Sequence, residues 1–367
     1  MFHIQYRIEN WVGVTPFLTE RRSKAYNFFI YLMYLLNALI CCWNCVIITK
    51  SISKGSGFTE TQQVLHIIYY ISDLFAVAYY LMNTIFNKGT WKVFIKKLRQ
   101  FEHQRITAQY TRRNDKITST MLVLNISILV TMFTVMVLGV FGSYYYMRRI
   151  DSRIIISVIV KLIRHLVNHM IVAMGIVIHI LIYKYEELDL FLTCELNSSN
   201  ATVDNVFKTA NFLHGEYFMV VQYLNRIFGC PILFYLVSSF AVTLYDIIHS
   251  IFEYVHAVDN VIASIILNYV FMCNVILDLT VMVVLITSCD ALEKAGKKVN
   301  RTCNVLQRGL AKSRLRDHLA ILAAYTKDQR PSISVAGLIT VNQLIVNLLV
   351  STFITYLIVA LQFDEYL

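Results

Sequence analysis

The 367-residue chain lacks several features of a water-soluble enzyme. Charged residues make up only 15% of it, whereas a typical soluble domain carries about 25%. Its 12 glycines and 3 prolines are too few for a collagen-like, disordered or linker-rich protein. Its eight cysteines do not have the spacing of a disulfide scaffold. We find no phosphate-binding loop and no nucleophile–base pair, so neither an enzyme nor a cofactor site is predicted.

Apolar residues, in contrast, are abundant: they make up 57% of the chain, and its mean hydropathy is +0.57. A single water-facing globule cannot bury so large an apolar fraction. Seven stretches reach the roughly 20 apolar residues that a membrane-spanning helix needs. They are residues 27–49, 64–86, 119–146, 154–183, 227–250, 261–288 and 338–361. The sequence therefore predicts an all-α membrane protein with seven transmembrane helices, surrounded by membrane lipids.

The basic residues indicate the orientation of these helices. Of the 33 Lys and Arg residues, 26 lie in the N-terminal segment and the three loops on its side of the membrane, and five lie on the other side. Since cytoplasmic loops are enriched in Lys and Arg, we expect the N-terminus inside the cell and the C-terminus outside. This distribution also accounts for the net charge of +10 without a nucleic-acid partner. The reverse orientation, which a G-protein-coupled receptor would need, is disfavoured.

Two of the inner loops contain helical patterns. Residues 91–101 (WKVFIKKLRQF) are typical of a basic amphipathic helix at the membrane surface. Residues 303–325 place leucines among charges near helical spacing, and Pro331 ends that pattern. We expect a cytoplasmic helical anchor that leads through a hairpin into the last span; a helix lying on lipid headgroups is the alternative. We divide the chain into residues 1–302, with six spans and a ligand pocket, and residues 303–367, with the anchor and the last span.

The last span carries a continuous polar stripe. Its members, spaced by 3, 4, 4, 4 and 7 residues, are Thr340, Gln343, Asn347, Ser351, Thr355 and Gln362. At about 100° per residue they fall within an arc of roughly 120°. Such a stripe is costly against lipid, so it faces either neighbouring helices, through hydrogen bonds, or a water-filled pore between several copies. In the pore interpretation, Ile354, Ile358 and Leu361 on the same arc form an apolar gate.

The span ends in Thr355-Tyr356, five apolar residues, and Gln362-Phe363. This pattern resembles the C-terminal signature of the insect gustatory receptor family, and the layout of seven spans with a basic loop before the last is also similar. The resemblance implies a tetrameric ligand-gated, non-selective cation channel of the odorant-receptor-like fold, formed from one or several kinds of subunit. It also implies that the last helix lines the pore, so that Phe363 either gates or packs. We therefore expect a gustatory receptor in the plasma membrane of sensory dendrites. Its ligand would be a small-molecule tastant, and we favour a bitter or aversive compound.

Ionisable and aromatic residues within the spans are candidates for ligand binding. We expect a pocket with contributions from spans 2 to 6, lined by Tyr69, Tyr70, Asp73, Tyr145, Lys161, Arg164, His165, Tyr245, Asp246 and Tyr269. The alternative is that Lys161 or Arg164 forms a structural ion pair with Asp246 or Asp73. His165 and His169 are four residues apart but have no third ligand at helical spacing, so no metal site is predicted.

Three other function classes share part of this pattern. An olfactory receptor of the same channel fold differs only in the class of ligand, and the intact Tyr356 and Gln362-Phe363 favour the gustatory branch. A G-protein-coupled receptor conflicts with the charge distribution, and the chain has neither Asp-Arg-Tyr nor Asn-Pro. A transporter is disfavoured because neither repeats nor helices broken by Gly and Pro are visible.

Overall fold

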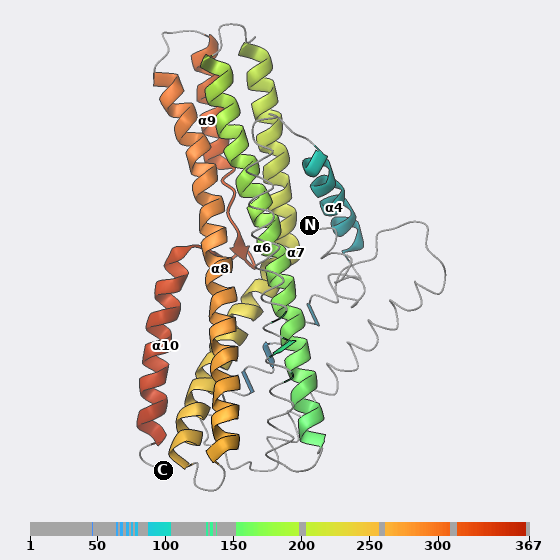
Figure 1. Ribbon diagram of the computed structural model, residues 1–367. Helices are drawn as coiled ribbons and strands as arrows, with labels where there is room; N and C mark the ends of the chain where they lie inside the picture. Colours follow the sequence, from blue (N-terminus) through green and yellow to red (C-terminus); the bar gives the residue numbers. More distant parts are fainter. Residues whose placement is uncertain are drawn as a thin grey trace, which may run out of the picture.

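The computed structural model describes residues 87–103, 152–197, 203–256, 261–308 and 314–364, with single positions between 46 and 79 and between 130 and 137. These residues form helices and one small hairpin (Figure 1). The elements are α4 (Lys88–His103), α6 (Ser152–Asn197), α7 (Val203–His256), α8 (Val261–Arg308), α9 (Arg314–Asp328), β1 (Ser334–Val335), β2 (Ile339–Thr340) and α10 (Gln343–Asp364). The predicted spans 27–49, 64–86 and 119–146 lie outside the described residues, apart from those single positions.

Helices α6, α7 and α8 are much longer than a bilayer is thick. They contain 46, 54 and 48 residues, which at about 1.5 Å per residue corresponds to roughly 70–80 Å. The hydrocarbon core of a bilayer is about 30 Å thick. Each helix contains one predicted span, 154–183, 227–250 or 261–288, and continues beyond it. In Figure 1 the three helices run side by side; α9 joins them at one end, and α10 lies along α8 in the other half.

Among the described residues, two helices contain a stretch long and apolar enough to cross a membrane, within Asp204–Ile248 and Val275–Arg308. The apolar helix Gln343–Val359 is shorter. Leu, Ile, Val and Phe dominate all three, and α7 continues through Pro231 although proline removes one backbone donor. Neighbouring membrane helices compensate for such losses.

Two expectations about the last 65 residues need correction. The pattern over 303–325 is not one helix, because residues 303–308 belong to α8 and α9 begins at Arg314. The last span is not helical throughout, because Thr340 lies in β2 and α10 begins only at Gln343. Residues 338–340 are not helical because Ile339 and Thr340 pair with Val335 and Ser334 in the hairpin, whereas hydropathy alone favoured a helix there. The predicted division of the chain between residues 302 and 303 falls within α8, which is continuous there. The division therefore corresponds to no break in the helix and stays a prediction about which segments carry which function.

The amphipathic helix expected over 91–101 is present as α4, but its apolar face contacts protein. Trp91, Phe94 and Leu98 are each at most 2% exposed. The Trp91 ring meets Phe228 of α7 edge to face, with ring centroids 5.7 Å apart. An ion pair between Lys97 of α4 and Glu216 of α7 also joins the two helices. The helix therefore packs against α7 instead of inserting these side chains into lipid.

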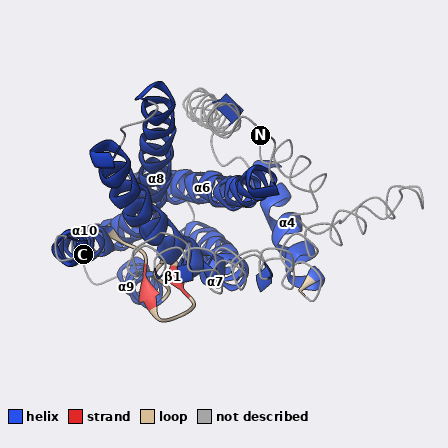
Figure 2. Ribbon diagram, turned by 90° about the horizontal axis from the view of Figure 1, so that it is seen from below, coloured by secondary structure: helices blue, strands red, loops and turns tan. Residues whose placement is uncertain are grey.

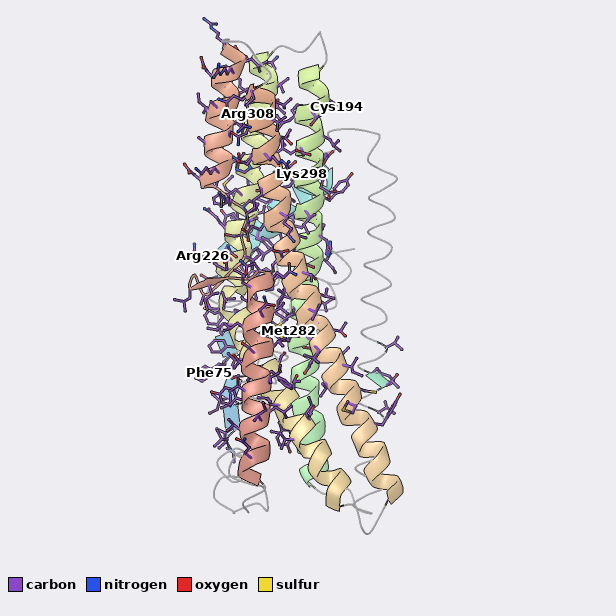
Figure 3. The ribbon with its side chains drawn as sticks, turned by 90° about the vertical axis from the view of Figure 1, so that its left-hand side faces the viewer. Phe75, Cys194, Arg226, Met282, Lys298 and Arg308 are labelled. Carbon is purple, nitrogen blue, oxygen red and sulfur yellow. The ribbon has the colours of Figure 1, made fainter. Side chains whose placement is uncertain are left out.

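The buried core runs along the contacts among α6, α7 and α8 and extends to α4, α9 and the start of α10. Viewed from below in Figure 2, α10 lies at the edge of this assembly, with the hairpin close to α9. Figure 3 shows α10 extending along the half of the assembly that contains Met282 and Phe75. Among the described residues, the last helix thus has one face packed on the bundle and an opposite face without packing partners.

Candidate functional site

The polar stripe of α10 lies on the face that points away from the other described helices. Helix α10 packs against α7 and α8 through buried Ile345 and partly buried Val346 and Leu349. The stripe residues Gln343, Asn347, Ser351 and Thr355 are all exposed. At about 100° per residue, the centres of these two faces are roughly 180° apart. The chain therefore presents the stripe outward.

The hydroxyl groups of the stripe bond to their own helix. Ser351 Oγ donates to the carbonyl oxygen of Leu348 at 3.0 Å, and Thr355 Oγ1 donates to that of Ser351 at 2.9 Å. Back-bonding of this kind satisfies a hydroxyl without a partner helix. These side chains are therefore available to face water, or a second subunit, without loss of a hydrogen bond inside the chain.

The apolar and terminal members of the predicted site follow the same face where they are described. Ile354 and Ile358 are 52% and 49% exposed, and Gln362 is exposed as well. The Tyr356 ring instead reaches back to Phe240 of α7, with centroids 6.2 Å apart and planes at 81°. The side chains of Leu361 and Phe363 lie outside the described residues. The signature thus contains an outward pair, Thr355 and Gln362, and an inward contact made by Tyr356.

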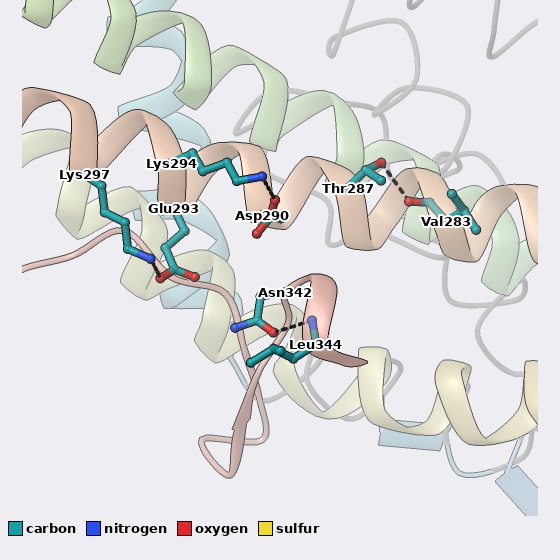
Figure 4. A network of polar contacts seen from close by, with 8 residues as sticks. All are labelled: Val283, Thr287, Asp290, Glu293, Lys294, Lys297, Asn342 and Leu344. Carbon is teal, nitrogen blue, oxygen red and sulfur yellow. Dashed lines mark hydrogen bonds and ion pairs between the residues drawn. The ribbon is translucent and has the colours of Figure 1, made fainter. Parts of the chain in front are cut away.

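The start of α10 is defined by a cap and by the hairpin before it. Asn342 Oδ1 accepts a hydrogen bond from the backbone N–H of Leu344 at 3.1 Å, which is the N-cap interaction (Figure 4). In the hairpin, Ala336 and Gly337 have positive φ angles of 51° and 74°. Glycine adopts this conformation at little cost, whereas alanine there is unusual.

In the ends of α6, α7 and α8 beyond the predicted spans, polar side chains join the helices. Asp189 of α6, although only 4% exposed, pairs with Lys298 Nζ of α8 at 2.9 Å and accepts a hydrogen bond from Thr302 Oγ1 at 2.5 Å. Asn300 of α8 donates to Thr326 Oγ1 of α9 at 3.0 Å. These contacts, together with buried leucines such as Leu322, form the helical anchor expected from the basic loops.

The same region buries titratable groups. Burial lowers the pKa of His214 to about 4, and a backbone interaction with Gln329 opposes that shift in part. Burial also raises the pKa of the Cys303 thiol to about 12, with a further contribution from the nearby charge of Asp189. The anchor therefore holds both groups in their neutral forms at physiological pH.

The predicted ligand-binding residues are only partly described. Asp246 is buried in α7, Tyr245 is half-buried beside it, and Tyr269 of α8 is 63% exposed. The backbones of Lys161, Arg164 and His165 belong to α6, but their side chains lie outside the described residues. Tyr69, Tyr70, Asp73 and Tyr145 also lie outside them. The described part thus does not bring the candidates together, and the pocket remains a prediction.

The structure reveals one intramembrane contact that helical periodicity did not predict. Asn168 Nδ2 of α6 donates to Asp278 Oδ1 of α8 at 3.0 Å, and both side chains are buried. Nearer the anchor, His179 Nε2 of α6 and Ser288 Oγ of α8 lie 3.1 Å apart, within hydrogen-bonding distance. Residue pairs about 110 positions apart thus recur along the parallel helices α6 and α8. In the described part of the chain, no three His, Cys, Asp or Glu residues are grouped as a metal would require.

Comparisons with known proteins agree with this architecture. The sequence matches the family described as 7tm Chemosensory receptor over residues 2–367. No functionally curated relative matches it. The fold is similar to that of the insect olfactory receptor OR5 from Machilis hrabei in complex with eugenol, with 11% identity, a TM-score of 0.72 and coverage of 98% of this chain and 96% of that one. A further structure of the insect olfactory receptor OR5 from Machilis hrabei gives 12% identity, with the same TM-score and the same coverage.

At these identities the solved structures show the fold alone, while the family match extends over almost the whole sequence. The all-α, multi-pass membrane architecture predicted from the apolar stretches is confirmed. The family consists of receptors and is not a family of enzymes. The orientation of the chain in the membrane stays a prediction. The chain belongs to the 7tm chemosensory receptor family.

Proposed function

We propose that this chain is a subunit of a ligand-gated, non-selective cation channel that detects small-molecule tastants. The observation that carries the proposal is the position of the α10 stripe: Gln343, Asn347, Ser351 and Thr355 are exposed and point away from the described helices of their own chain. Around a four-fold axis, four such faces would line a water-filled path. Thr340, in β2, would stand at its cytoplasmic entrance.

The gate belongs to the outer half of the same face. Exposed Ile354 and Ile358, followed by Leu361, would form apolar rings that exclude water while the helices are close together. Phe363 either completes this gate or packs beside it. Ligand binding favours the open arrangement by interacting more strongly with it than with the closed one.

The ligand site is proposed among the membrane helices before α10. Asp246 is buried in α7 at the level of Tyr245, which suits a polar anchor in an aromatic surround. The related olfactory receptor was solved with eugenol, which makes a small organic molecule the first class to test. We place the channel in the plasma membrane of sensory dendrites, as a homo- or heterotetramer.

Taste is favoured over olfaction by the C-terminal signature Thr355-Tyr356 and Gln362-Phe363. Bitter or aversive compounds are preferred over sugars, since the sequence contains nothing that points to sugar recognition. The alternative is an olfactory receptor of the same fold, which the likeness to the Machilis hrabei receptor supports. The two differ in whether soluble tastants or volatile odorants evoke current.

The test is whole-cell recording from cells that express the full chain, during application of quinine, caffeine, sucrose and eugenol. We expect a ligand-evoked cation current whose ion selectivity or block changes in Asn347→Ala and Gln362→Ala. The matched control is Leu349→Ala, on the packed face of the same helix. Selectivity that is unaltered by both stripe variants, or altered equally by the control, would exclude α10 as the pore wall.

Two further outcomes bear on the assembly and the orientation. Surface protein without any current would contradict a homomeric channel and calls for co-expression with a second receptor subunit. An N-terminal tag that antibodies reach without permeabilisation would contradict the inside N-terminus, and with it the channel topology.

A further inference from the structure

The hairpin that precedes α10 is hydrogen-bonded to α7 through one side chain. Asn225 Nδ2 donates to the carbonyl oxygen of Ser332 at 2.9 Å, and Asn225 Oδ1 accepts from the N–H of Ser334 at 3.0 Å. The side-chain amide of Asn225 thus donates one hydrogen bond to this short backbone segment and accepts one from it, as the backbone of a neighbouring strand would. Both distances are ordinary for N–H···O bonds.

One helical turn further along α7, the hairpin touches the helix backbone. A Cβ atom at Gly229 would lie 3.1 Å from the carbonyl oxygen of Ser334 and 3.3 Å from the nitrogen of Ala336. Both distances are below ordinary van der Waals contact. Asn225 and Gly229 are four residues apart, so they lie on one face of α7. That face of α7 therefore binds the hairpin backbone through the Asn225 amide, and the absence of a side chain at Gly229 lets the hairpin come close to the helix.

The segment before the hairpin is fixed to α8 in a comparable way. A Cβ atom at Gly296 would lie 2.4 Å from Cδ and from Cγ of Pro331. Within the hairpin, Ile333 and Val335 are 1% and 3% exposed, and Val341, directly after it, is 2% exposed. The backbone N–H of Val341 donates to the carbonyl oxygen of Ile333 at 2.8 Å, which closes the hairpin at its base. The hairpin is therefore held by α7 and α8 together.

From this arrangement we infer that residues 331–342 are a joint that places the cytoplasmic end of α10, with Asn225 as its main positioning residue. Gly229 and Gly296 are the further positioning residues, because each admits the joint to a helix surface. The inference rests on the proposed function: it says what sets the direction of the stripe. Rotation of the first turn of α10 about its axis would move Gln343 and Asn347 off the pore-facing arc.

Hydrogen–deuterium exchange on the purified full-length protein tests the joint without any ligand. In Asn225→Ala we expect exchange to accelerate by about tenfold in residues 332–341, the size expected when one or two hydrogen bonds are lost. We also expect acceleration to continue into the first two turns of α10, residues 343–349. Asn225→Asp keeps only the acceptor for the Ser334 N–H, so its exchange should fall between those of wild type and Asn225→Ala.

The matched control is Asn300→Ala, which removes the amide that joins α8 to α9. It should accelerate exchange in α9 and leave residues 343–349 unchanged. Exchange in Asn225→Ala equal to that in wild type, or acceleration confined to residues 332–341, would overturn the positioning role. Since the measurement needs no current, a silent wild-type chain in recordings would count against the proposed function and leave this result intact.

Discussion

Acidification should loosen the helical anchor through one buried histidine. His214 is 1% exposed, and its ring nitrogens make no hydrogen bond of ordinary geometry; the backbone of Gln329 is close enough only to oppose the pKa shift in part. Its neighbours are aromatic: Tyr185 and Tyr325 meet it edge to face, with ring centroids 5.8 and 5.3 Å away. None of these rings carries a charge at neutral pH to stabilise an imidazolium. Burial is accordingly the main cause of the lowered pKa of about 4.

The sign and size of the effect follow from this pKa. A histidine in the unfolded chain has a pKa of about 6.5 and takes up a proton there, while His214 in the folded chain remains neutral until about pH 4. The unfolded state therefore binds more protons between these values, and stability falls as the pH falls through that window. At pH 5 the linkage relation gives a loss of about 2 kcal/mol, or roughly 30-fold in the opening equilibrium.

Hydrogen exchange in α7 and α9 between pH 7.5 and pH 5, corrected for the chemical exchange rate, measures this opening. We expect the wild-type protection to fall by about 30-fold and His214→Phe, which keeps an aromatic ring, to lose most of the pH dependence. His318→Phe is the control, because that ring stacks on Phe207 and lies 3.5 Å from Asp204. An identical acid response in His214→Phe and wild type would refute the reasoning.

Three further results are expected. Gly296→Ala brings a Cβ atom to 2.4 Å from Pro331 and should destabilise the fold by about 1–3 kcal/mol, seen as a lower thermal midpoint in detergent and as acceleration of exchange near residue 331. Asp189→Ala removes a buried carboxylate and leaves half-buried Thr302 without its acceptor, while exposed Lys298 remains solvated; it should lower the free energy of unfolding by about 1–3 kcal/mol, measured as reduced yield of monodisperse protein. Maleimide at pH 7.5 should modify exposed Cys194 much faster than buried Cys303, as peptide mass spectrometry would show.

The sequence allowed the architecture to be predicted because hydropathy and charge act over long stretches. Twenty apolar residues in a row have few alternatives to a membrane helix, and the leucine pattern around 303–325 indicated a helical anchor. The α10 stripe was visible because a polar group in lipid is costly wherever it occurs. Pro331 correctly indicated that a turn follows the anchor.

The contacts between helices were beyond the reach of the same reasoning. Nothing local distinguishes Asn225 from any other polar residue at the end of an apolar stretch, because its partners are backbone atoms 107 and 109 residues away. The pairing of Asn168 with Asp278 depends in the same way on the register of two parallel helices. Thr340 was placed in the last helix because hydropathy does not distinguish an apolar strand from the start of an apolar helix.

The outward stripe also bears on the proposed assembly of several copies. Ser351 and Thr355 satisfy their hydroxyl groups on their own helix, but the amides of Gln343 and Asn347 are exposed on the lipid-accessible side of a single chain. Leaving an amide without a hydrogen-bond partner in hydrocarbon costs a few kcal/mol. In the proposed tetramer, several copies around one axis would remove that cost by providing water or one another as partners. The face that would gain from other copies is thus the face that the proposed joint at Asn225 directs away from the described bundle.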